Sequence, residues 1–406
     1  MNAPEPQSWR DPANPGGPLL PQPGWHLPPY HRWSFQHMRE LTPTAGVRRG
    51  HGDVRRLHEA RRDLGGVSFE SRERRLTIDR FVEDSWTDGF LILHRGQVLE
   101  ERYGNGMAPE RLHLSMSMAK SILGSVVGIL ASRGEIALGA NLPEYLPELE
   151  ATAYRSATVQ HILDMTSGVT FDETYETPGS HMQKLGHACA WGGRGGRPGW
   201  PRTVWELVLE LGEQERLHGE SFIYRSIETD VLGFLVERVS GLPLAELVSR
   251  ELWQRLGAEE DAAYTVDSGG FALADGGFNA TLRDYGRYGR MLADGGRVGD
   301  AQVVPEAWVE ETRFGSGGRF EGAYAEVLPK GGYHNKFWQV DRVRGTVLCR
   351  GIYGQFIYVD RELGYVGVKL STWPGPLDRN GAIDTIAAFE AIGRALGAAP
   401  ARATDR

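Results

Sequence analysis

The sequence predicts an α/β (α+β) protein in which an antiparallel sheet is flanked by helices and a mostly helical domain is inserted into the body. Runs rich in β-branched and aromatic residues occur at 90–103 and return at 346–370. The patterns between them, over 140–260, are mostly helical. The expected divisions are a Pro-rich N-terminal arm and surface segment at 1–70, an α/β body at 71–139 and 261–406, and the inserted helical domain at 140–260.

The strands of the body are expected near both ends of the chain. Residues 90–93 and 98–103 flank a glycine-containing turn and predict a hairpin. A second group of strands is expected at 346–349, 356–359 and 365–370. Because helices separate the two groups, the cleft between the body and the inserted domain is the expected site.

A buried helix is expected to begin near Ser117 and to end at Gly134, because apolar residues cover most of its circumference. Residues 171–200 read as an irregular segment, with a glycine-rich run at 192–197. That run lacks the preceding strand and the following Lys-Ser/Thr of a phosphate loop, so a mobile loop over a site is the better interpretation. Further helices are expected at 158–168, capped by Thr158, at 205–211, 229–240 and 244–256, from Thr281 to Leu292, and at 385–396.

The bulk composition excludes several classes of protein. Lys and Arg total 45 against 53 Asp and Glu, and the formal charge of −8 argues against a nucleic-acid partner. No apolar run reaches the length of a membrane span and no signal peptide is evident, so we expect a cytoplasmic protein without a membrane partner. Cys189 and Cys349 are expected as free thiols, and the absence of H-E-x-x-H and C-x-x-C patterns predicts no metal and no cofactor.

The first candidate catalytic residues lie in one short stretch, 117–120. Ser117 and Lys120 form an S-x-x-K pair that lies on one face of a helix if the stretch is helical. A hydroxyl beside an amine is a nucleophile beside a possible base, and the positive helix N-terminus favours a developing oxyanion. The pattern alone is weak, because it arises by chance roughly once in a few hundred residues. A helix start with a solvated lysine is the alternative.

Three further motifs follow the Ser117–Lys120 pair along the chain, and the order of the four motifs is informative. Their order resembles the serine β-lactamase and penicillin-binding protein superfamily, in its class C-like branch, over residues 85–395. The resemblance rests on Ser117-x-x-Lys120, Thr166-Ser167-Gly168, Tyr224-Arg225-Ser226 and Gly351-x-x-Gly354-Gln355. Within that branch the chain is most similar to the 6-aminohexanoate-dimer hydrolases and related carboxylesterases, through Arg32-Trp33-Ser34-Phe35, the stretch 117–120 and Tyr175.

The resemblance implies a β-lactamase-like body and a role for each matched residue. Ser117 is then the acylated nucleophile, and Lys120 and Tyr224 move its proton. The backbone N–H groups of Ser117 and Ile352 form the oxyanion hole, and Tyr175 contacts the substrate. Lys120 can act as a base only if burial and nearby cations lower its pKa from about 10.4. Trp338 and Trp373 are expected either to line the cleft or to pack in the core.

Two departures from the family pattern bear on the substrate. The third motif begins with Lys or His in β-lactamases and peptidases, where that residue helps to hold a substrate carboxylate, but reads Cys349-Arg350-Gly351 here. This argues against penicillin hydrolysis. Proficient amide-oligomer hydrolases carry an acidic residue where this chain has Gly186. Asp275 is expected either to supply such a charge as a substrate-binding residue or to be a turn residue.

The leading hypothesis is a serine hydrolase that cleaves linear amides or esters through an acyl-enzyme on Ser117. Short esters are the safer expectation, because alkoxides leave more easily than amines. The alternatives are a transacylase or DD-peptidase-like enzyme, a weak β-lactamase, and a non-catalytic binding domain on the same fold. The expected partner is a small-molecule ester or amide, and the expected state is a monomer or a homodimer.

Overall fold

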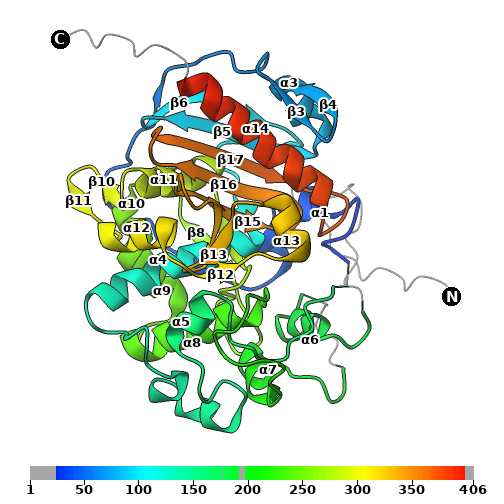
Figure 1. Cartoon of the computed structure of the whole chain (residues 1–406), viewed down its shortest axis with the longest axis vertical. Helices are drawn as coiled ribbons and strands as arrows, with labels where there is room; N and C mark the ends of the chain where they lie inside the picture. Colours follow the sequence, from blue (N-terminus) through cyan, green and yellow to red (C-terminus); the bar gives the residue numbers. More distant parts are fainter. Residues whose placement is uncertain (1–23, 176, 192–196, 398–406) are drawn as a thin grey trace, which may run out of the picture.

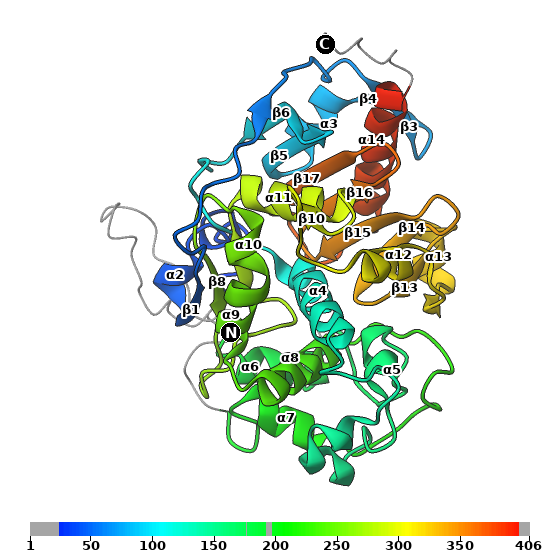
Figure 2. The ribbon, with the colours of Figure 1, turned by 90° about the vertical axis from the view of Figure 1, so that its left-hand side faces the viewer.

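The computed structural model describes residues 24–175, 177–191 and 197–397. Figure 1 shows a large sheet with α14 laid across one face, and a helical region below it. Figure 2 shows α4 at the junction of the two layers. The expected fold class, an antiparallel sheet with flanking helices beside a helical region, is confirmed. The division of the chain into three domains stays a prediction.

The large sheet joins strands from both ends of the chain. Its order is β12-β13-β14-β15-β16-β17-β5-β6-β2, antiparallel throughout except where β2 meets β6. The predicted hairpin is confirmed as β5 and β6, and Val368 of β17 pairs with Leu91 of β5. The strands are β2 (His58–Glu59), β5 (Thr87–His94), β6 (Gln97–Tyr103), β12 (Gly318–Arg319), β13 (Gly332–His334), β14 (Phe337–Asp341), β15 (Thr346–Gly351), β16 (Gln355–Asp360) and β17 (Tyr365–Ser371).

Both faces of the sheet are buried, which explains the continuous apolar runs of β5 and β17. Leu91 and Val368 belong to the core shared with α4 and α11, whereas Phe90 and Tyr365 belong to the core under α14. Each fully buried side chain of this size contributes about 1.5–3 kcal/mol. The covering helices are α3 (Ile78–Asp84), α11 (Leu282–Ala293), α12 (Glu306–Phe314), α13 (Gly322–Val327) and α14 (Arg379–Gly397), the last starting six residues before its predicted beginning at Thr385.

The predicted central helix is confirmed. A single 3₁₀ turn at Met116–Met118 leads into α4 (Ala119–Ser132), in which every residue from Ala119 to Leu130 is buried. Glycines allow close neighbours: a Cβ on Gly124 would lie 2.4 Å from the Asn335 carbonyl oxygen. This packing holds the N-terminal turn of α4 rigidly between the sheet and the helical region.

The helical region differs from prediction in two places. The helix expected at 158–168 ends at Leu163, because the Asp164 carboxylate is drawn to His334 and to the Asn335 N–H. A helix that was not predicted, α6, is capped by the Ser180 side chain. The elements are α5 (Val159–Leu163), α6 (His181–Ala188), α7 (Val204–Glu210), α8 (Ile227–Ser240), α9 (Leu244–Val248), a π turn (Ser249–Trp253) and α10 (Gln254–Leu256), with 3₁₀ turns at Leu142–Glu144 and Pro147–Ala151.

The segment that follows the Pro-rich arm docks on the body. Trp25 and Phe35 are buried in a small aromatic core with Tyr353. Part of this segment, β1, also pairs with β8 in a four-stranded sheet of order β1-β8-β9-β7. The remaining elements are α1 (His31–Ser34), α2 (Met38–Leu41), β1 (Thr44–Val47), β3 (Ser68–Ser71), β4 (Arg74–Thr77), β7 (His113–Leu114), β8 (Ala262–Thr265), β9 (Phe278–Ala280), β10 (Arg297–Val298) and β11 (Ala301–Gln302).

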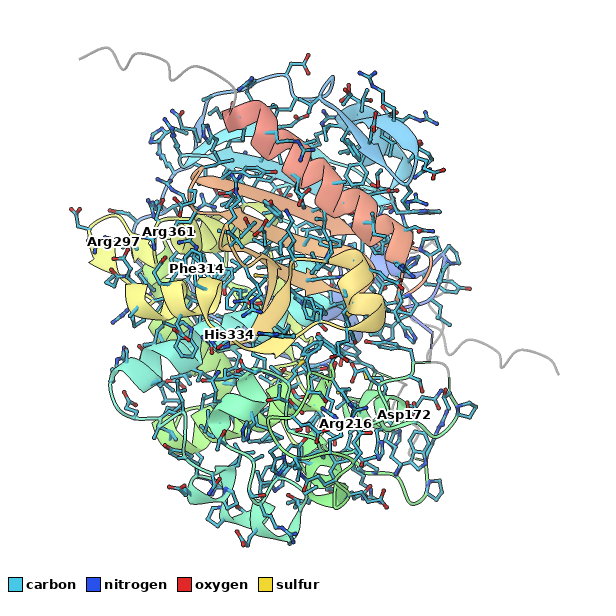
Figure 3. All side chains as sticks on the ribbon, viewed as in Figure 1. Asp172, Arg216, Arg297, Phe314, His334 and Arg361 are labelled. Carbon is cyan, nitrogen blue, oxygen red and sulfur yellow. The ribbon has the colours of Figure 1, made fainter. Side chains whose placement is uncertain are left out.

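A polar contact ties the two layers together. His334, labelled in Figure 3, lies at the end of β13 where the sheet meets the helical region. Its Nδ1 lies 2.8 Å from Asp164 Oδ1, directly after α5. Hydrogen bonding to Asp164 and the nearby Glu311 charge outweigh burial and raise the pKa of His334 above its usual value. In the described part of the chain, no helix is long and apolar enough to cross a membrane.

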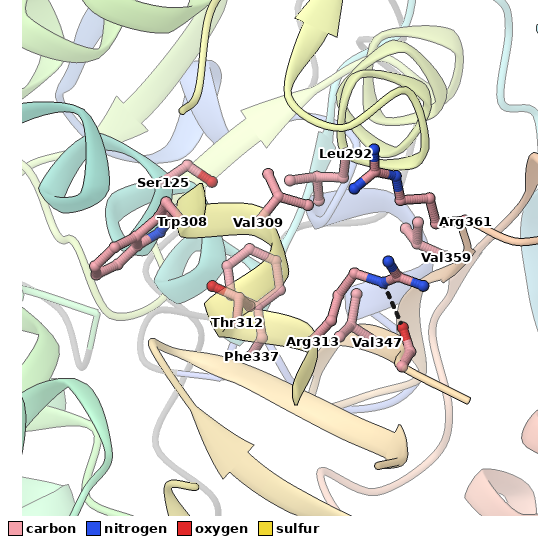
Figure 4. A pocket seen from close by; sticks show the side chains of 11 residues that line it. Ser125, Leu292, Trp308, Val309, Thr312, Arg313, Phe337, Val347, Val359 and Arg361 are labelled. Atoms are coloured by element: carbon pink, nitrogen blue, oxygen red, sulfur yellow. Dashed lines mark hydrogen bonds between the residues drawn. The ribbon is translucent and has the colours of Figure 1, made fainter. Parts of the chain in front are cut away.

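Figure 4 shows a small cavity between α4, α12 and the sheet. Its volume of about 10 Å³ is at the lower limit for a single water molecule. Arg313 Nε donates a 2.9 Å hydrogen bond to the Gly345 carbonyl beside it. Ser125 of α4 and Trp308 of α12 are among the residues that line it. The cavity is a packing gap and is too small for a substrate.

Candidate active site

The 3₁₀ turn before α4 presents Ser117 to a cleft. Met116 has φ of 47°, a left-handed conformation that is uncommon for a residue with a side chain. One helical turn on, Lys120 donates from Nζ to Ser117 Oγ over 2.9 Å. The structure therefore brings together the S-x-x-K pair as the spacing predicts. The strained backbone of Met116, directly before Ser117, changes the direction of the chain at the start of the turn.

Lys120 is fixed by groups from three separate parts of the chain. Besides Ser117, Nζ donates to Ser226 Oγ at 3.2 Å and to the Asp275 carbonyl oxygen at 2.6 Å. The side chain is buried, so all three donors of the ammonium group are used within the protein. This arrangement leaves the nitrogen no freedom to turn away from the serine.

Tyr224 completes the group around Ser117. Its hydroxyl interacts electrostatically with Ser117 and Lys120, and its ring stacks on Trp338 with 5.4 Å between centroids. The Lys120 Nζ lies 5.3 Å from the centre of the tyrosine ring. Burial raises the pKa of Tyr224, although Lys120 and the hydrogen bond from Ser117 oppose the shift. The phenol is therefore neutral at pH 7.

A lowered pKa of Lys120 is required if this lysine is to act as a base, but the structure does not provide one. Burial alone lowers the pKa, but electrostatic interactions with Tyr224, Asp275 and Glu173 outweigh burial and raise the pKa above its usual value. The free protein thus holds an ammonium on Lys120 and a neutral phenol on Tyr224. Since the two groups interact closely, they lose a proton as a pair rather than as independent residues.

Glu173 is a site residue that the sequence did not reveal. Its carboxylate accepts hydrogen bonds from Ser226 Oγ at 2.6 Å and from the Ser226 N–H at 2.9 Å. Burial raises the pKa of Glu173 to about 7, with Lys120 acting in the opposite direction. Its position two residues before Tyr175 was the only signal in the sequence, and an acidic residue in an irregular segment is ordinarily solvated.

Gly351 lets β15 approach the nucleophile. A Cβ at this position would lie 2.4 Å from the Ser115 carbonyl oxygen and 3.0 Å from the Ser117 nitrogen. Ile352 follows, and the next residue, Tyr353, has φ of 60°. Outside the sheets and helices, the Ile352 N–H donates to no carbonyl among the described residues. The backbone of 351–352 thus runs alongside Ser117, in the arrangement that an oxyanion hole requires.

The cleft has two chambers that share Tyr175, Ile352 and Pro376. The catalytic chamber, about 260 Å³, reaches Ser117, and the distal chamber, about 320 Å³, lies beside α6. The catalytic chamber is lined by Ser117, Glu173, Thr174, Tyr175, Tyr224, Tyr324, Trp338, Arg350, Gly351, Ile352, Trp373, Pro376 and Leu377. The distal chamber is lined by His26, Leu27, Met116, Tyr175, Met182, Gln183, Gly186, His187, Trp191, Arg197, Trp200, Ile352, Tyr353 and Pro376.

The other candidate residues fall at different places. Tyr175 lines both chambers, and Trp338 and Trp373 line the catalytic one while also packing in the core. Gly186 lines the distal chamber. Asp275 lines neither: its carbonyl accepts from Lys120, its N–H donates to Asp230 Oδ1, and burial raises the pKa of its carboxyl. A substrate contact by Asp275 stays a prediction, and the geometry favours a role in fixing Lys120.

Three further predictions concern the surroundings of the site. Described residues of the segment 171–200, among them Tyr175, Met182 and Trp200, line the cleft. Residues 176 and 192–196 fall outside the described residues, and a mobile loop over the site stays a prediction. Within the part of the chain that the structure describes, no three His, Cys, Asp or Glu side chains gather as metal ligands. Cys189 and Cys349 are buried free thiols.

Comparison with known proteins places this geometry in a family. The model of the beta-lactamase family matches residues 76–391. The chain belongs to this family. Among its relatives, it is 37% identical to the 6-aminohexanoate-dimer hydrolase of Paenarthrobacter ureafaciens over 358 residues, which cover 88% of this chain and 89% of that protein. It is 30% identical to esterase EstB of Burkholderia gladioli over 195 residues, covering 46% and 47% of the two chains.

Solved structures of the family agree with these matches. A Bacillus anthracis protein, provisionally named a 6-aminohexanoate-dimer hydrolase, superposes with a TM-score of 0.83 at 28% identity, over 93% of this chain and 97% of that one. EstCE1, a hydrolase with promiscuous acyltransferase activity, has a TM-score of 0.61 at 16% identity, over 77% and 96% of the chains. The second match shows the shared fold alone. The resemblance drawn from the motifs is confirmed.

Replacing Glu173 tests the electrostatics of this beta-lactamase-family site. Glu173 in its anionic form raises the pKa of both Lys120 and Tyr224. In Glu173→Gln that charge is absent, so the pair loses its proton at lower pH. We expect the alkaline-rising limb of the pH profile of kcat/KM for ester hydrolysis to move to lower pH. An inflection near pH 7, where the Glu173 carboxyl titrates, disappears.

The matched control is Glu321→Gln, which removes an exposed carboxylate beside α13. Its profile should superpose on that of the wild type. If Glu173→Gln folds normally and its rising limb coincides with the wild-type limb, Glu173 does not set the pKa of the pair.

Proposed function

We propose that this chain is a serine hydrolase that cleaves esters or amides of linear small molecules through an acyl-enzyme on Ser117. The observation that carries the proposal is the 2.9 Å contact between Ser117 Oγ and a buried Lys120, with the Tyr224 hydroxyl on the same serine, at the wall of a chamber open to a ligand. A binding domain has no need for a lysine and a tyrosine converging on one hydroxyl.

Acylation begins with the loss of one proton from the Lys120–Tyr224 pair. The deprotonated pair accepts the Ser117 proton as Oγ attacks the carbonyl carbon. The N–H groups of Ser117 and Ile352 are placed to stabilise the tetrahedral oxyanion, each typically by about 2.7–4 kcal/mol. The pair then returns the proton to the leaving alcohol or amine, through the Tyr224 hydroxyl.

Deacylation reuses the same groups in reverse order. Water takes the place of the leaving group beside Tyr224 and gives up a proton to the pair as it attacks the acyl carbon. The tetrahedral intermediate collapses, and the proton returns to Ser117 Oγ. The reaction therefore consumes one water and leaves the enzyme unchanged.

The shape of the cleft supports a linear substrate. Two chambers meet at Tyr175 and Ile352, so a chain with the scissile carbonyl at Ser117 extends into both. The similarity to a 6-aminohexanoate-dimer hydrolase and to an esterase supports amides and esters as the bond classes. Gly186 gives the distal chamber no acidic group for a substrate amine, which favours esters. A cytoplasmic location and a monomeric or homodimeric state remain predictions.

Parallel turnover of three substrates tests the class of bond. The substrates are 4-nitrophenyl acetate, nitrocefin and the 6-aminohexanoate dimer, each measured with the wild type and with Ser117→Ala. We expect the ester to have the highest kcat/KM and all activity to depend on Ser117. Faster turnover of nitrocefin than of the other two would contradict the assignment to linear substrates.

A further inference from the structure

Two residues with a left-handed backbone border the proposed oxyanion hole. Met116 directly precedes Ser117 and has φ of 47°, and Tyr353 directly follows Ile352 and has φ of 60°. Residues with a side chain adopt this conformation only where the surrounding structure holds them in it. Each of the two proposed N–H donors therefore lies next to a strained residue that depends on its packing.

Both strained residues pack into the same small core. The side chains of Met116 and Tyr353 are each buried to 3% exposure. The other buried members of this core are Trp25, Phe35, Met38 and Leu114. The first three belong to the N-terminal segment, residues 24–38, which lies outside the range 76–391 that the family model matches. A segment remote in sequence from the catalytic motifs thus covers both strained residues.

Phe35 contacts the backbone on both sides of the oxyanion hole. Its fully buried ring meets the Tyr353 ring edge to face, with 5.2 Å between centroids. Its carbonyl oxygen accepts a 2.8 Å hydrogen bond from the N–H of Leu114, three residues before Ser117. One residue therefore holds the chain that leads to Ser117 through its main chain and the residue after Ile352 through its ring.

Polar contacts fix the N-terminal segment beside Phe35. His31 Nε2 lies 2.9 Å from the Trp373 carbonyl oxygen. Arg32 donates to Asp88 Oδ1 at 2.8 Å and to Thr372 Oγ1 at 2.7 Å. The Asp88 side chain is fully buried, so release of Arg32 would remove a partner from a buried carboxylate, which is costly. The body of the protein therefore sets the position of the segment.

We propose that Phe35 is a positioning residue that holds the two oxyanion donors, the N–H groups of Ser117 and Ile352, in place. The inference rests on the proposed hydrolase function and adds to it a residue that touches no reacting atom. Phe35 acts by packing against residues whose backbone the chain alone would not keep left-handed. Donors held in advance in this way stabilise the oxyanion without reorganising during the reaction.

The variant Phe35→Leu tests this role, because leucine stays apolar but removes the ring edge that meets Tyr353. We expect kcat for 4-nitrophenyl acetate, per site labelled at saturation by a fluorophosphonate probe, to fall about tenfold or more, but less than the roughly 10²–10³-fold typical of losing a donor. KM should change little, because acylation and deacylation use the same donors. The inhibition constant of benzeneboronic acid, which becomes tetrahedral on Ser117, should rise by the factor by which kcat falls.

Phe389→Leu is the matched control. Phe389 is fully buried as well, but it lies in the core under α14, next to Phe90 and Tyr358. Both variants should lower the melting temperature, since each shortens a buried side chain, whereas kcat per labelled site should fall only in Phe35→Leu. A similar fall in both variants, or a fall in neither, would overturn the positioning role.

If Phe35→Leu does not fold, Phe35→Met and Phe389→Met take the place of the two leucine variants. Methionine is long and flexible and fills irregular space in a core, but it lacks the ring. The same outcomes then support or overturn the proposal.

Hydrogen exchange read by mass spectrometry separates this proposal from the hydrolase function, since it requires no turnover. The N–H groups of Leu114 and Tyr353 donate to the Phe35 and Pro376 carbonyl oxygens at 2.8 Å and 3.0 Å. We expect peptides that contain them to exchange faster in Phe35→Leu than in the wild type and in Phe389→Leu. Equal exchange would overturn the proposal even if the wild type hydrolyses esters. Conversely, a wild type that hydrolyses no ester but shows this Phe35-dependent protection would refute only the hydrolase function.

Discussion

Replacing Lys120 with methionine should lower kcat/KM for 4-nitrophenyl acetate by about 10²–10⁴-fold. Methionine keeps most of the side-chain length but removes the nitrogen that donates to Ser117, Ser226 and the Asp275 carbonyl. Without it, Ser117 has no group to take its proton except a neutral Tyr224 with a raised pKa. The measurement is steady-state kinetics with a thermal melt on the same preparation.

Loss of a buried cation can also unfold the protein, so a second variant separates the two effects. Tyr224→Phe removes one hydroxyl and leaves the ring stacked on Trp338. We expect it to stay folded and to lose activity within the same range. If folded Lys120→Met keeps kcat/KM within about threefold of the wild type, Lys120 takes no part in proton transfer, because a general base is worth far more.

Replacing Gly351 with alanine should lower kcat by about 10²–10³-fold, as expected when one donor of an oxyanion hole is misplaced. The new methyl group meets the Ser115 carbonyl oxygen at 2.4 Å and the Ser117 nitrogen at 3.0 Å. Both are backbone atoms, so the clash is relieved only if β15 moves away from the turn before α4. That movement separates the Ile352 N–H from the Ser117 N–H.

The effect on kcat distinguishes this change from simple loss of stability. Overpacking of this kind costs about 1–3 kcal/mol, which a stable domain tolerates. Gly139→Ala, where a Cβ meets no atom within 4 Å, is the matched control and should be fully active. An unchanged kcat in Gly351→Ala would show that the approach of 351–352 to Ser117 does not build the oxyanion hole.

What the sequence could predict depends on how local each signal is. The Ser117–Lys120 pair can be predicted from the spacing of one helical turn. The hairpin of β5 and β6 can be predicted from its two strand-like runs and the turn between them. Tyr224 lies in another domain of the expected division, and only the order of the family motifs linked it to Ser117. These are the parts of the site that the structure brings together as expected.

The features that were missed arise from contacts between distant segments. The raised pKa of Lys120 comes from Tyr224, Asp275, Glu173 and Asp230, which reach it from distant parts of the chain. No local pattern reveals that convergence, so the sequence could indicate only that a lysine base requires a lowered pKa. In the sequence, Arg350 belongs to a third motif that lacks the Lys or His at its head. That the Arg350 side chain lines the catalytic chamber cannot be seen from the sequence of the strand.

The most direct test of the acyl-enzyme on Ser117 is labelling with a fluorophosphonate probe, read by intact mass and peptide mapping. The account predicts one adduct per chain on the wild type, located at Ser117. The adduct should be absent from Ser117→Ala and retained in Ser132→Ala, which removes a hydroxyl at the far end of α4. Folded wild type that takes up no probe, or Ser117→Ala labelled as fully as the wild type, would contradict it.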